Sequence, residues 1–277
     1  MDFLLEANLS DIWLRDFAPV RSNRLVRFRY HPLHVTPRKS SDISKSFDNF
    51  LSQYRLILRH SSQMILDGGN VVDNGQDKAV VTDRVFYDNR RFYKDFQINL
   101  MLTDALGYSK VAVMSELQGD LLGHTGDMLS FIDTNAIASG SLPSLYQNRA
   151  LEQLRSAFGN DIRVTVIPNH YKSRVPLWHG LPSACGLYVN SILTSDHLYV
   201  PLYGADPESA WNETLDQQVL STIRSATSKN VVPIQVSNSV CSIGASLRRL
   251  SWQLQGFYAD QLINIAKNQS KNSYDCK

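Results

Sequence analysis

Short runs rich in β-branched and aromatic residues alternate along the chain with polar, helix-compatible segments. The runs that predict strands are residues 24–30, 78–86, 110–116, 128–133, 163–169, 197–204 and 231–236. The segments that predict helices are residues 46–60, 148–158 and 213–226. This alternation indicates an α/β protein built from strand–helix–strand units that recur without an identical sequence.

No stretch reads as a linker, so we expect residues 1–277 to form a single domain. A chain of 277 residues with 43% hydrophobic residues can bury a large core. Residues 36–46 are polar and include a proline, which favours an exposed loop before a helix. Residues 267–277 are polar and predict a flexible tail.

The charge and the hydropathy of the chain limit which kinds of molecule we expect it to bind. The net charge of +2 is spread along the chain, so we expect neither nucleic acid nor a membrane as a partner. The first residues lack the basic start of a signal peptide, which favours a cytoplasmic protein. The three cysteines, Cys185, Cys241 and Cys276, have no metal-like spacing, and their odd number favours free thiols over a disulfide framework.

Two acidic motifs are candidates for binding a ligand. In "DIWLRDFAPV", Trp13 and Asp16 stand just before a proline and could hold a cation, although an ion pair of Arg15 with Asp16 is the structural alternative. In "MILDGGNVVDNG", Asp67 and Asn70 flank two glycines after an apolar run. The alternative for that motif is a tight turn capped by Asp67.

Two further motifs contain residues suited to proton transfer or hydrogen bonding. In "GHTGDM", His124 and Asp127 lie in a glycine-flanked turn, where a carboxylate could orient an imidazole that moves protons near neutral pH. In "SACGLYVNSI", Asn190 could face a cleft, or could only satisfy its own turn. Cys185 in the same motif fits a buried small apolar residue better than a nucleophile.

Taken in order, these motifs resemble those of the agmatine deiminase and bacterial peptidylarginine deiminase family of guanidine-modifying proteins. The blocks that carry the resemblance are residues 13–16, 67–70, 123–127, 184–190 and 244–253. The resemblance implies a pentein fold, a five-bladed α/β propeller of ββαβ modules around a central pore, with the first module shortened here. It also implies no metal or organic cofactor.

The resemblance assigns roles to several of these residues. In the family a cysteine thiolate attacks the guanidinium carbon, carboxylates grip the planar cation and a histidine moves protons. By position, Asp16 is similar to a clamp carboxylate, Asp67 to the acid near the leaving nitrogen and His124 to the general acid/base. Trp13, Asn70 and Asn190 are expected to help to bind the substrate.

The chain departs from the family pattern at two positions. Counting back from Gln253 in "SIGASLRRLSWQ", which we expect to be the active-site strand, the nucleophile position falls on Arg249. A guanidinium cannot form the covalent intermediate, and its charge repels a cationic substrate unless an acid pairs with it. In the histidine motif the acid position holds Gly126, and Asp127 comes one residue later, so its carboxylate is expected to point away from the clamp unless the turn rearranges.

Four functions follow from these departures. The protein could be a catalytically degenerate family member that binds an anionic or zwitterionic small molecule or a peptide in the pore. It could instead perform non-covalent acid/base chemistry with Asp16, Asp67 and His124. In that case Arg249 would bind a substrate carboxylate or phosphate or stabilise developing negative charge, and Asp127 is a further catalytic candidate. A third possibility is an active deiminase that uses Cys241. An interaction module without a pore ligand is the fourth, and a homo-oligomer is compatible with all of them.

Overall fold

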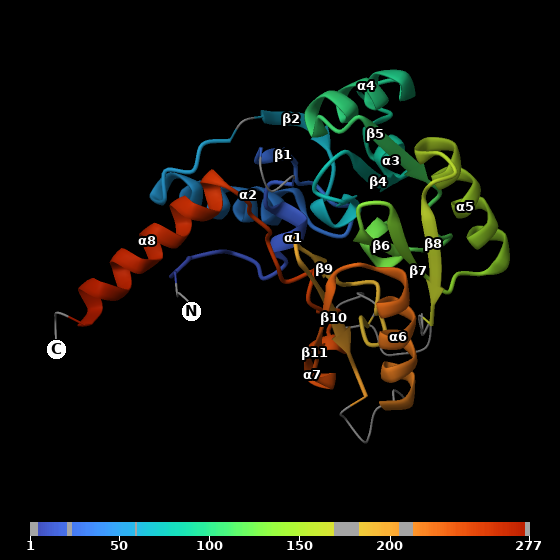
Figure 1. Ribbon diagram of the computed structural model, residues 1–277. Helices are drawn as coiled ribbons and strands as arrows, with labels where there is room; N and C mark the ends of the chain where they lie inside the picture. The colour runs from blue at the N-terminus through green and yellow to red at the C-terminus, as the bar shows by residue number, and fades with distance from the viewer. Residues whose placement is uncertain (1–4, 21–23, 59, 169–182, 205–212, 275–277) are drawn as a thin grey trace.

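Three sheets with the same strand order make up most of the protein. The computed structural model describes residues 5–20, 24–58, 60–168, 183–204 and 213–274 (Figure 1). The three sheets are β3 (Val72–Asp73), β4 (Lys78–Thr82) and β5 (Lys110–Met114); β6 (Leu129–Asp133), β7 (Ala136–Gly140) and β8 (Arg163–Ile167); and β9 (Ile192–Leu193), β10 (His197–Leu202) and β11 (Asn230–Gln235). In each, the first strand is antiparallel to the second and the second is parallel to the third.

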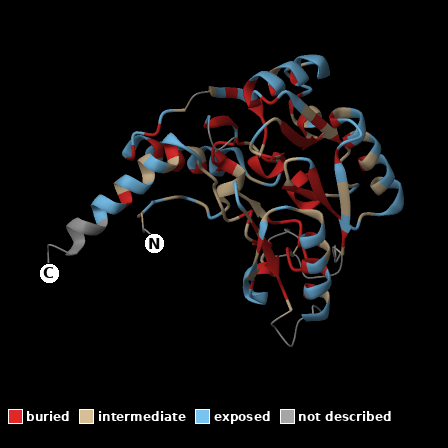
Figure 2. Cartoon of the chain, viewed as in Figure 1, coloured by how far each residue is buried: buried red, intermediate tan, exposed pale blue. Residues whose placement is uncertain are grey.

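Helices make the crossovers between the parallel strands. They are α3 (Arg84–Asn89) and α4 (Asp95–Leu106) in the first of these sheets, α5 (Ser144–Phe158) in the second and α6 (Glu213–Ala226) in the third. Each sheet with its helices is therefore a ββαβ module, as the family resemblance implies. The helices lie on the outside of the molecule, and their exposed faces contrast with the buried central strands in Figure 2.

A smaller sheet precedes these modules. It pairs β1 (Val26–Arg29) in parallel with β2 (His60–Ile65), and α2 (Pro37–Gln53) connects them. In place of an antiparallel first strand there is a single bridge between Val20 and Val26. The four sheets follow one another around the molecule in chain order (Figure 1), and the first module is the short one, as expected.

The segment after β11 forms no strand among the described residues. Helix α7 (Asn238–Cys241) is followed by consecutive turns, so the active-site strand expected at residues 242–253 is absent. The segment links the last sheet to the N-terminal residues, because Gln253 donates to the Leu193 carbonyl and Trp252 donates to the Pro19 carbonyl. These side-chain hydrogen bonds to neighbouring modules hold the segment in place without the backbone hydrogen bonds of a sheet.

The exposed loop predicted for residues 36–46 is wrong, because most of it is the first half of α2. Thr36 caps this helix by accepting a hydrogen bond from the Lys39 N–H, and Pro37 occupies the first helical position. Ile43 and Phe47 are fully buried in the core. Packing of this apolar stripe stabilises a helix whose first half is too polar to be recognised by composition.

The flexible tail predicted from residue 267 is helical as far as Tyr274. Helix α8 (Phe257–Tyr274) extends away from the body of the molecule (Figure 1). Tyr258 and Gln261 attach its first turns to the end of α2, by donating to the carbonyls of Ile57 and Tyr54. In the part of the chain that the structure describes, no helix is long and apolar enough to cross a membrane.

The expectation of free thiols is wrong for two of the three cysteines. Cys185 and Cys241 form a disulfide with a Cα–Cα distance of 4.7 Å across a sequence separation of 56 residues. It ties α7 to the segment before β9. The pairing depends on the course of the chain, which cysteine spacing does not reveal. A cytoplasmic location stays a prediction, and the disulfide weighs against it because such bonds persist mainly in oxidising compartments.

The disulfide gives the first testable prediction. Labelling of thiols in denaturant without reductant should modify one cysteine, Cys276, since two of the three are paired. The Cys185→Ala/Cys241→Ala variant should lose about 2–4 kcal/mol of unfolding free energy, because the bond constrains the unfolded chain. Urea unfolding measures this loss, and reductant should destabilise the native protein but not the variant. Three labelled thiols would contradict the pairing.

Candidate functional site

Three short helical turns bring the acidic and histidine motifs together. They are α1 (Leu14–Phe17), which contains Asp16, the 3₁₀ turn Gly68–Asn70, which follows Asp67, and the 3₁₀ turn Thr125–Asp127, which follows His124. The three turns come from different modules and contact one another. Residues about 50 or more positions apart in sequence therefore meet at one place.

Asn70 holds two of these turns in register. Its side-chain oxygen accepts from the backbone N–H groups of Thr82 and Thr125, at 2.8 and 3.3 Å, and from both of their hydroxyls. Asn70 is 2% exposed, so these bonds are made away from water and fix the geometry. The structure places Asn70 as a brace beside the site, where the sequence predicted contact with a ligand.

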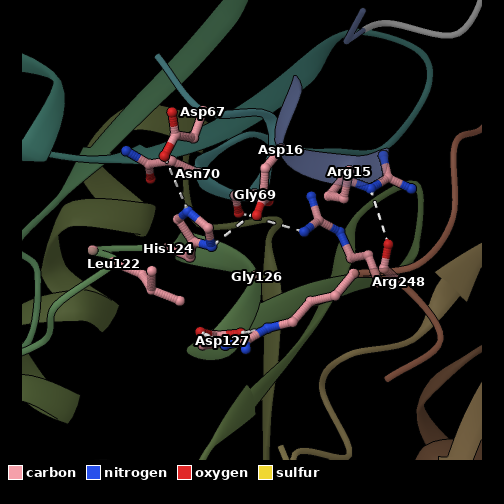
Figure 3. Close-up of polar contacts among 12 residues, drawn as sticks. Arg15, Asp16, Asp67, Gly69, Asn70, Leu122, His124, Gly126, Asp127 and Arg248 are labelled. Atoms are coloured by element: carbon pink, nitrogen blue, oxygen red, sulfur yellow. Dashed lines mark hydrogen bonds and ion pairs between the residues drawn. The ribbon is translucent and has the colours of Figure 1, made fainter. Parts of the chain in front are cut away.

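His124 lies between two carboxylates. Its Nδ1 is 3.9 Å from Asp16 Oδ1, and its Nε2 is 3.6 Å from Asp67 Oδ2 (Figure 3). Among the described residues, Asp16 Oδ1, Asp67 Oδ1 and His124 Nε2 are buried and have no hydrogen-bond partner. Buried polar atoms of native proteins are nearly always paired, so three such atoms at one place indicate a binding site.

Gly69 makes this close approach of the motifs possible. A Cβ atom at residue 69 would collide with the His124 ring and with the Asp16 carboxylate. Any other residue there would push the acid and the histidine apart. The sequence suggested that this glycine provides backbone freedom. In the structure its importance is that it lacks a side chain and leaves room for the two motifs.

The charges around His124 shift the pKa values of the cluster. Burial lowers the pKa of His124, but the carboxylates of Asp16, Asp67 and Asp127 outweigh burial and raise the pKa above its ordinary value. Burial raises the pKa of Asp16 to about 6; the charge of His124 opposes this rise and that of Asp67 adds to it. The neighbouring acids thus favour the protonated form of the His124 imidazole.

Asp127 and Arg249 form a buried ion pair. Arg249 Nε is 3.2 Å from Asp127 Oδ1, and Arg249 Nη2 contacts Asp127 Oδ2, so the guanidinium binds the carboxylate through two nitrogens. Arg249 Nη1 also donates to the Gly244 carbonyl at 2.8 Å. The exposed fractions are 4% for Arg249 and 1% for Asp127. The Asp127 carboxylate is thereby directed to Arg249, and the positive charge expected at the nucleophile position is neutralised.

Arg248 explains the glycine at the acid position of the histidine motif. A Cβ atom at residue 126 would collide with the Arg248 guanidinium. That guanidinium donates to the carbonyls of Gly69 and Val71. A side chain at residue 126 would therefore require the Arg248 guanidinium to move from this position. Arg248 was missed in the sequence, where the only signal was its pairing with Arg249 in "RR".

Asn190 holds the backbone of Arg248 and Arg249 in place. Its side-chain oxygen accepts from the backbone N–H groups of Arg248 and Arg249, at 3.0 and 3.2 Å. Asn190 is fully buried, and its oxygen is therefore used within the protein. The structure gives it the part of orienting the arginine pair.

A space of about 20 Å³ adjoins the acid–histidine cluster. Its lining residues are Trp13, Asp16, His34, Leu122 and Arg249. His34 and Leu122 were not among the predicted site residues, and neither is in a motif that composition would single out. The volume suffices for about one water-sized group, so a larger ligand has to displace a lining side chain.

The cluster can bind a hydrogen-bond donor and hold a proton, and no thiol lines the adjoining space. None of the residues that line the space is a cysteine, and two cysteines are joined in the disulfide. Within the described ranges there is no group of three or more histidines, cysteines or acids with the geometry of a metal site.

The repeated ββαβ modules are those of a pentein-type α/β fold. Residues 3–254 match the family model described as Porphyromonas-type peptidyl-arginine deiminase, and the chain belongs to this family. The C. jejuni agmatine deiminase structure is similar with a TM-score of 0.68 and 17% identity, over 91% of this chain and 76% of that one.

Other solved structures share the fold. The agmatine deiminase of Enterococcus faecalis is similar with a TM-score of 0.62 and 16% identity, over 87% of this chain and 74% of that one. An amidinotransferase from Microseira wollei has a TM-score of 0.54 and 11% identity, over 88% and 69%. These similarities support the pentein fold.

The buried ion pair gives a stability prediction. Asp127→Asn should cost about 3–5 kcal/mol of unfolding free energy, because it leaves the Arg249 charge buried without its partner. The Asp127→Leu/Arg249→Met double variant should lose less than the single variant. Urea unfolding measures both. Asp42→Asn, at an exposed aspartate on α2, is the control and should cost less than about 1 kcal/mol. Equal losses for Asp127→Asn and the control would refute the pair.

The position of His124 gives a titration prediction. NMR of the imidazole should show a pKa above the ordinary value of about 6.5, and Asp16→Asn should lower it by removing a neighbouring carboxylate. Since the folded-state pKa is raised, His124 stabilises the protein below about pH 6.5 and loses this contribution as pH rises through the folded pKa. A pKa that does not respond to Asp16→Asn would contradict the geometry.

Proposed function

We propose that the protein binds the guanidinium group of a small molecule or a peptidyl arginine at Asp16, Asp67 and His124 without hydrolysing it through a thiol. The observation that carries the proposal is the convergence of three buried atoms that have no hydrogen-bond partner among the described residues, two of them carboxylate oxygens. Carboxylate oxygens in a buried site bind planar cationic donors through charge-assisted hydrogen bonds. Agmatine and peptidyl arginine, named in the family and its relatives, carry such a group.

The absence of covalent chemistry rests on Arg249 and on the cysteines. Arg249 stands at the position that the motif gives to the nucleophile, and its guanidinium is occupied by Asp127. The relocated thiol considered for Cys241 is unsupported, because this sulfur is bonded to Cys185. The protein is therefore proposed to be a degenerate member of its family.

The charge balance of the cluster favours a cationic ligand over the anionic or zwitterionic one first expected. Arg249 and Asp127 cancel each other, so Arg249 offers no net charge to an anion. The remaining cluster contains two carboxyl groups, those of Asp16 and Asp67, and one imidazole, so acidic groups outnumber basic groups there. Assembly into a homo-oligomer stays a prediction.

Calorimetry tests the proposal. Agmatine and N-acetyl-arginine amide should bind to the native protein, and Asp16→Asn should weaken binding about tenfold or more by removing a charged acceptor. Asp77→Asn changes an exposed carboxylate outside the site and should leave binding unchanged. Incubation of either ligand with the protein should release no ammonia.

Two results would overturn this function. Failure of both ligands to bind at about 10 mM, a concentration at which even a single weak charged contact is detected, would remove the ligand class. Ammonia release that disappears in His124→Asn would show that catalysis persists.

A further inference from the structure

A second and larger cavity lies on the other side of the arginine pair. It has a volume of about 230 Å³ and is bordered by residues at the inner strands β3, β6 and β9, which contact one another. Arg248 lines this cavity, whereas its neighbour Arg249 lines the small space beside Asp16. In Figure 3, Arg15 and Arg248 lie side by side, away from His124.

The two guanidinium groups at this cavity form no ion pair with an acid among the described residues, and Asp73 is the acid whose charge acts most strongly on both. Arg15 donates to the Arg248 carbonyl, the Ser251 hydroxyl and the Gln253 amide oxygen, at 3.0–3.2 Å. The Arg248 side chain donates to backbone carbonyls, and Arg248 is 6% exposed. Among the described residues, neither forms an ion pair. A buried arginine is normally paired with a carboxylate or phosphate, so both charges are compensated only in part.

The pKa shifts of the two arginines also support the binding of an anion. Burial lowers the pKa of Arg15 to about 9, and the charge of Arg248 adds to this effect. Burial also lowers the pKa of Arg248. Two like charges held beside each other and away from water favour an anion between or in front of them.

The rest of the lining reinforces this preference. Lys229 adds a third positive charge, and Asp73 is the one acid among the lining residues. Three cations and one carboxylate leave a net charge of +2 on the wall. Asp73 Oδ1 is already engaged by the Gly75 N–H. Hydroxyl and amide side chains complete the lining with neutral hydrogen-bonding groups, and the residues concerned are Ser130, Ser191, Thr134, Gln76 and Gln255.

We propose that this cavity is a binding site for a small oxyanion, a carboxylate or a phosphate, held by Arg15, Arg248 and Lys229. A guanidinium presents several N–H donors in a plane, a geometry that matches the oxygens of either group. The site is separate from the acid–histidine cluster, whose unpaired atoms include two carboxylate oxygens. The consecutive arginines divide the interior into a cation-binding side and an anion-binding side.

Thermal unfolding with inorganic phosphate and with malonate tests the site, each against sodium chloride of equal ionic strength. At a tenfold excess over Kd, the better of the two anions should raise Tm by roughly 3–5 °C. Lys229→Glu reverses a charge at the edge of the cavity and should abolish most of the shift. Lys45→Glu, at an exposed lysine on α2 outside the cavity, is the matched control and should keep it.

Arg248→Gln should also lose the shift, and calorimetry should show at least tenfold weaker binding where this variant folds. Lys229→Glu keeps the test valid where Arg248→Gln does not fold. Asp16→Asn should keep the anion effect, which separates this proposal from guanidinium binding. A larger response to phosphate than to malonate would assign the site to phosphate, and the reverse to carboxylates. No shift with either anion, or an equal shift in Lys229→Glu, would overturn the site.

Discussion

The bidentate ion pair between Arg249 and Asp127 is the interaction on which the interior of the protein depends. Both side chains are almost fully buried, and removal of either would leave an uncompensated charge. The pair directs the Asp127 carboxylate to the Arg249 guanidinium and keeps this guanidinium buried inside the protein. It also removes the charge repulsion that a lone arginine would exert on a cationic ligand.

Several departures from the family pattern form one coordinated arrangement. Gly126 leaves the room that the Arg248 guanidinium occupies, and Asp127 supplies the acid that Arg249 requires. Asn190 then fixes both arginine N–H groups from a single oxygen. Because each residue fits only in the presence of the others, we interpret them as a repacked interior. A single lost catalytic residue would not need these compensations.

The strands and the family were accessible from sequence because they depend on local signals. Runs of β-branched residues marked most strands, and five short motifs in order marked the family. Helix α2 was misjudged between residues 37 and 46, because its stability comes from the burial of Ile43 and Phe47 in a tertiary core. The Cys185–Cys241 bond was missed because it depends on the path of the chain between distant modules.

In the candidate site, too, some residues were predicted from the sequence and others were not. Asp16, Asp67 and His124 were found by motif and lie together. The partner of Asp127 was not predictable, because it depends on how one 3₁₀ turn directs a side chain. Arg248 had no recognisable role until the space beside Gly126 was known. Residues whose role comes from shape, and not from chemical type, are therefore the ones that sequence reasoning missed.

A crystal structure of the native protein at high resolution tests the central claim most directly. The account predicts density for the Arg249 guanidinium on the Asp127 carboxylate, with both Asp127 oxygens within hydrogen-bonding distance. An Arg249 side chain directed to solvent, with Asp127 turned toward His124 and a reduced cysteine beside them, would contradict it.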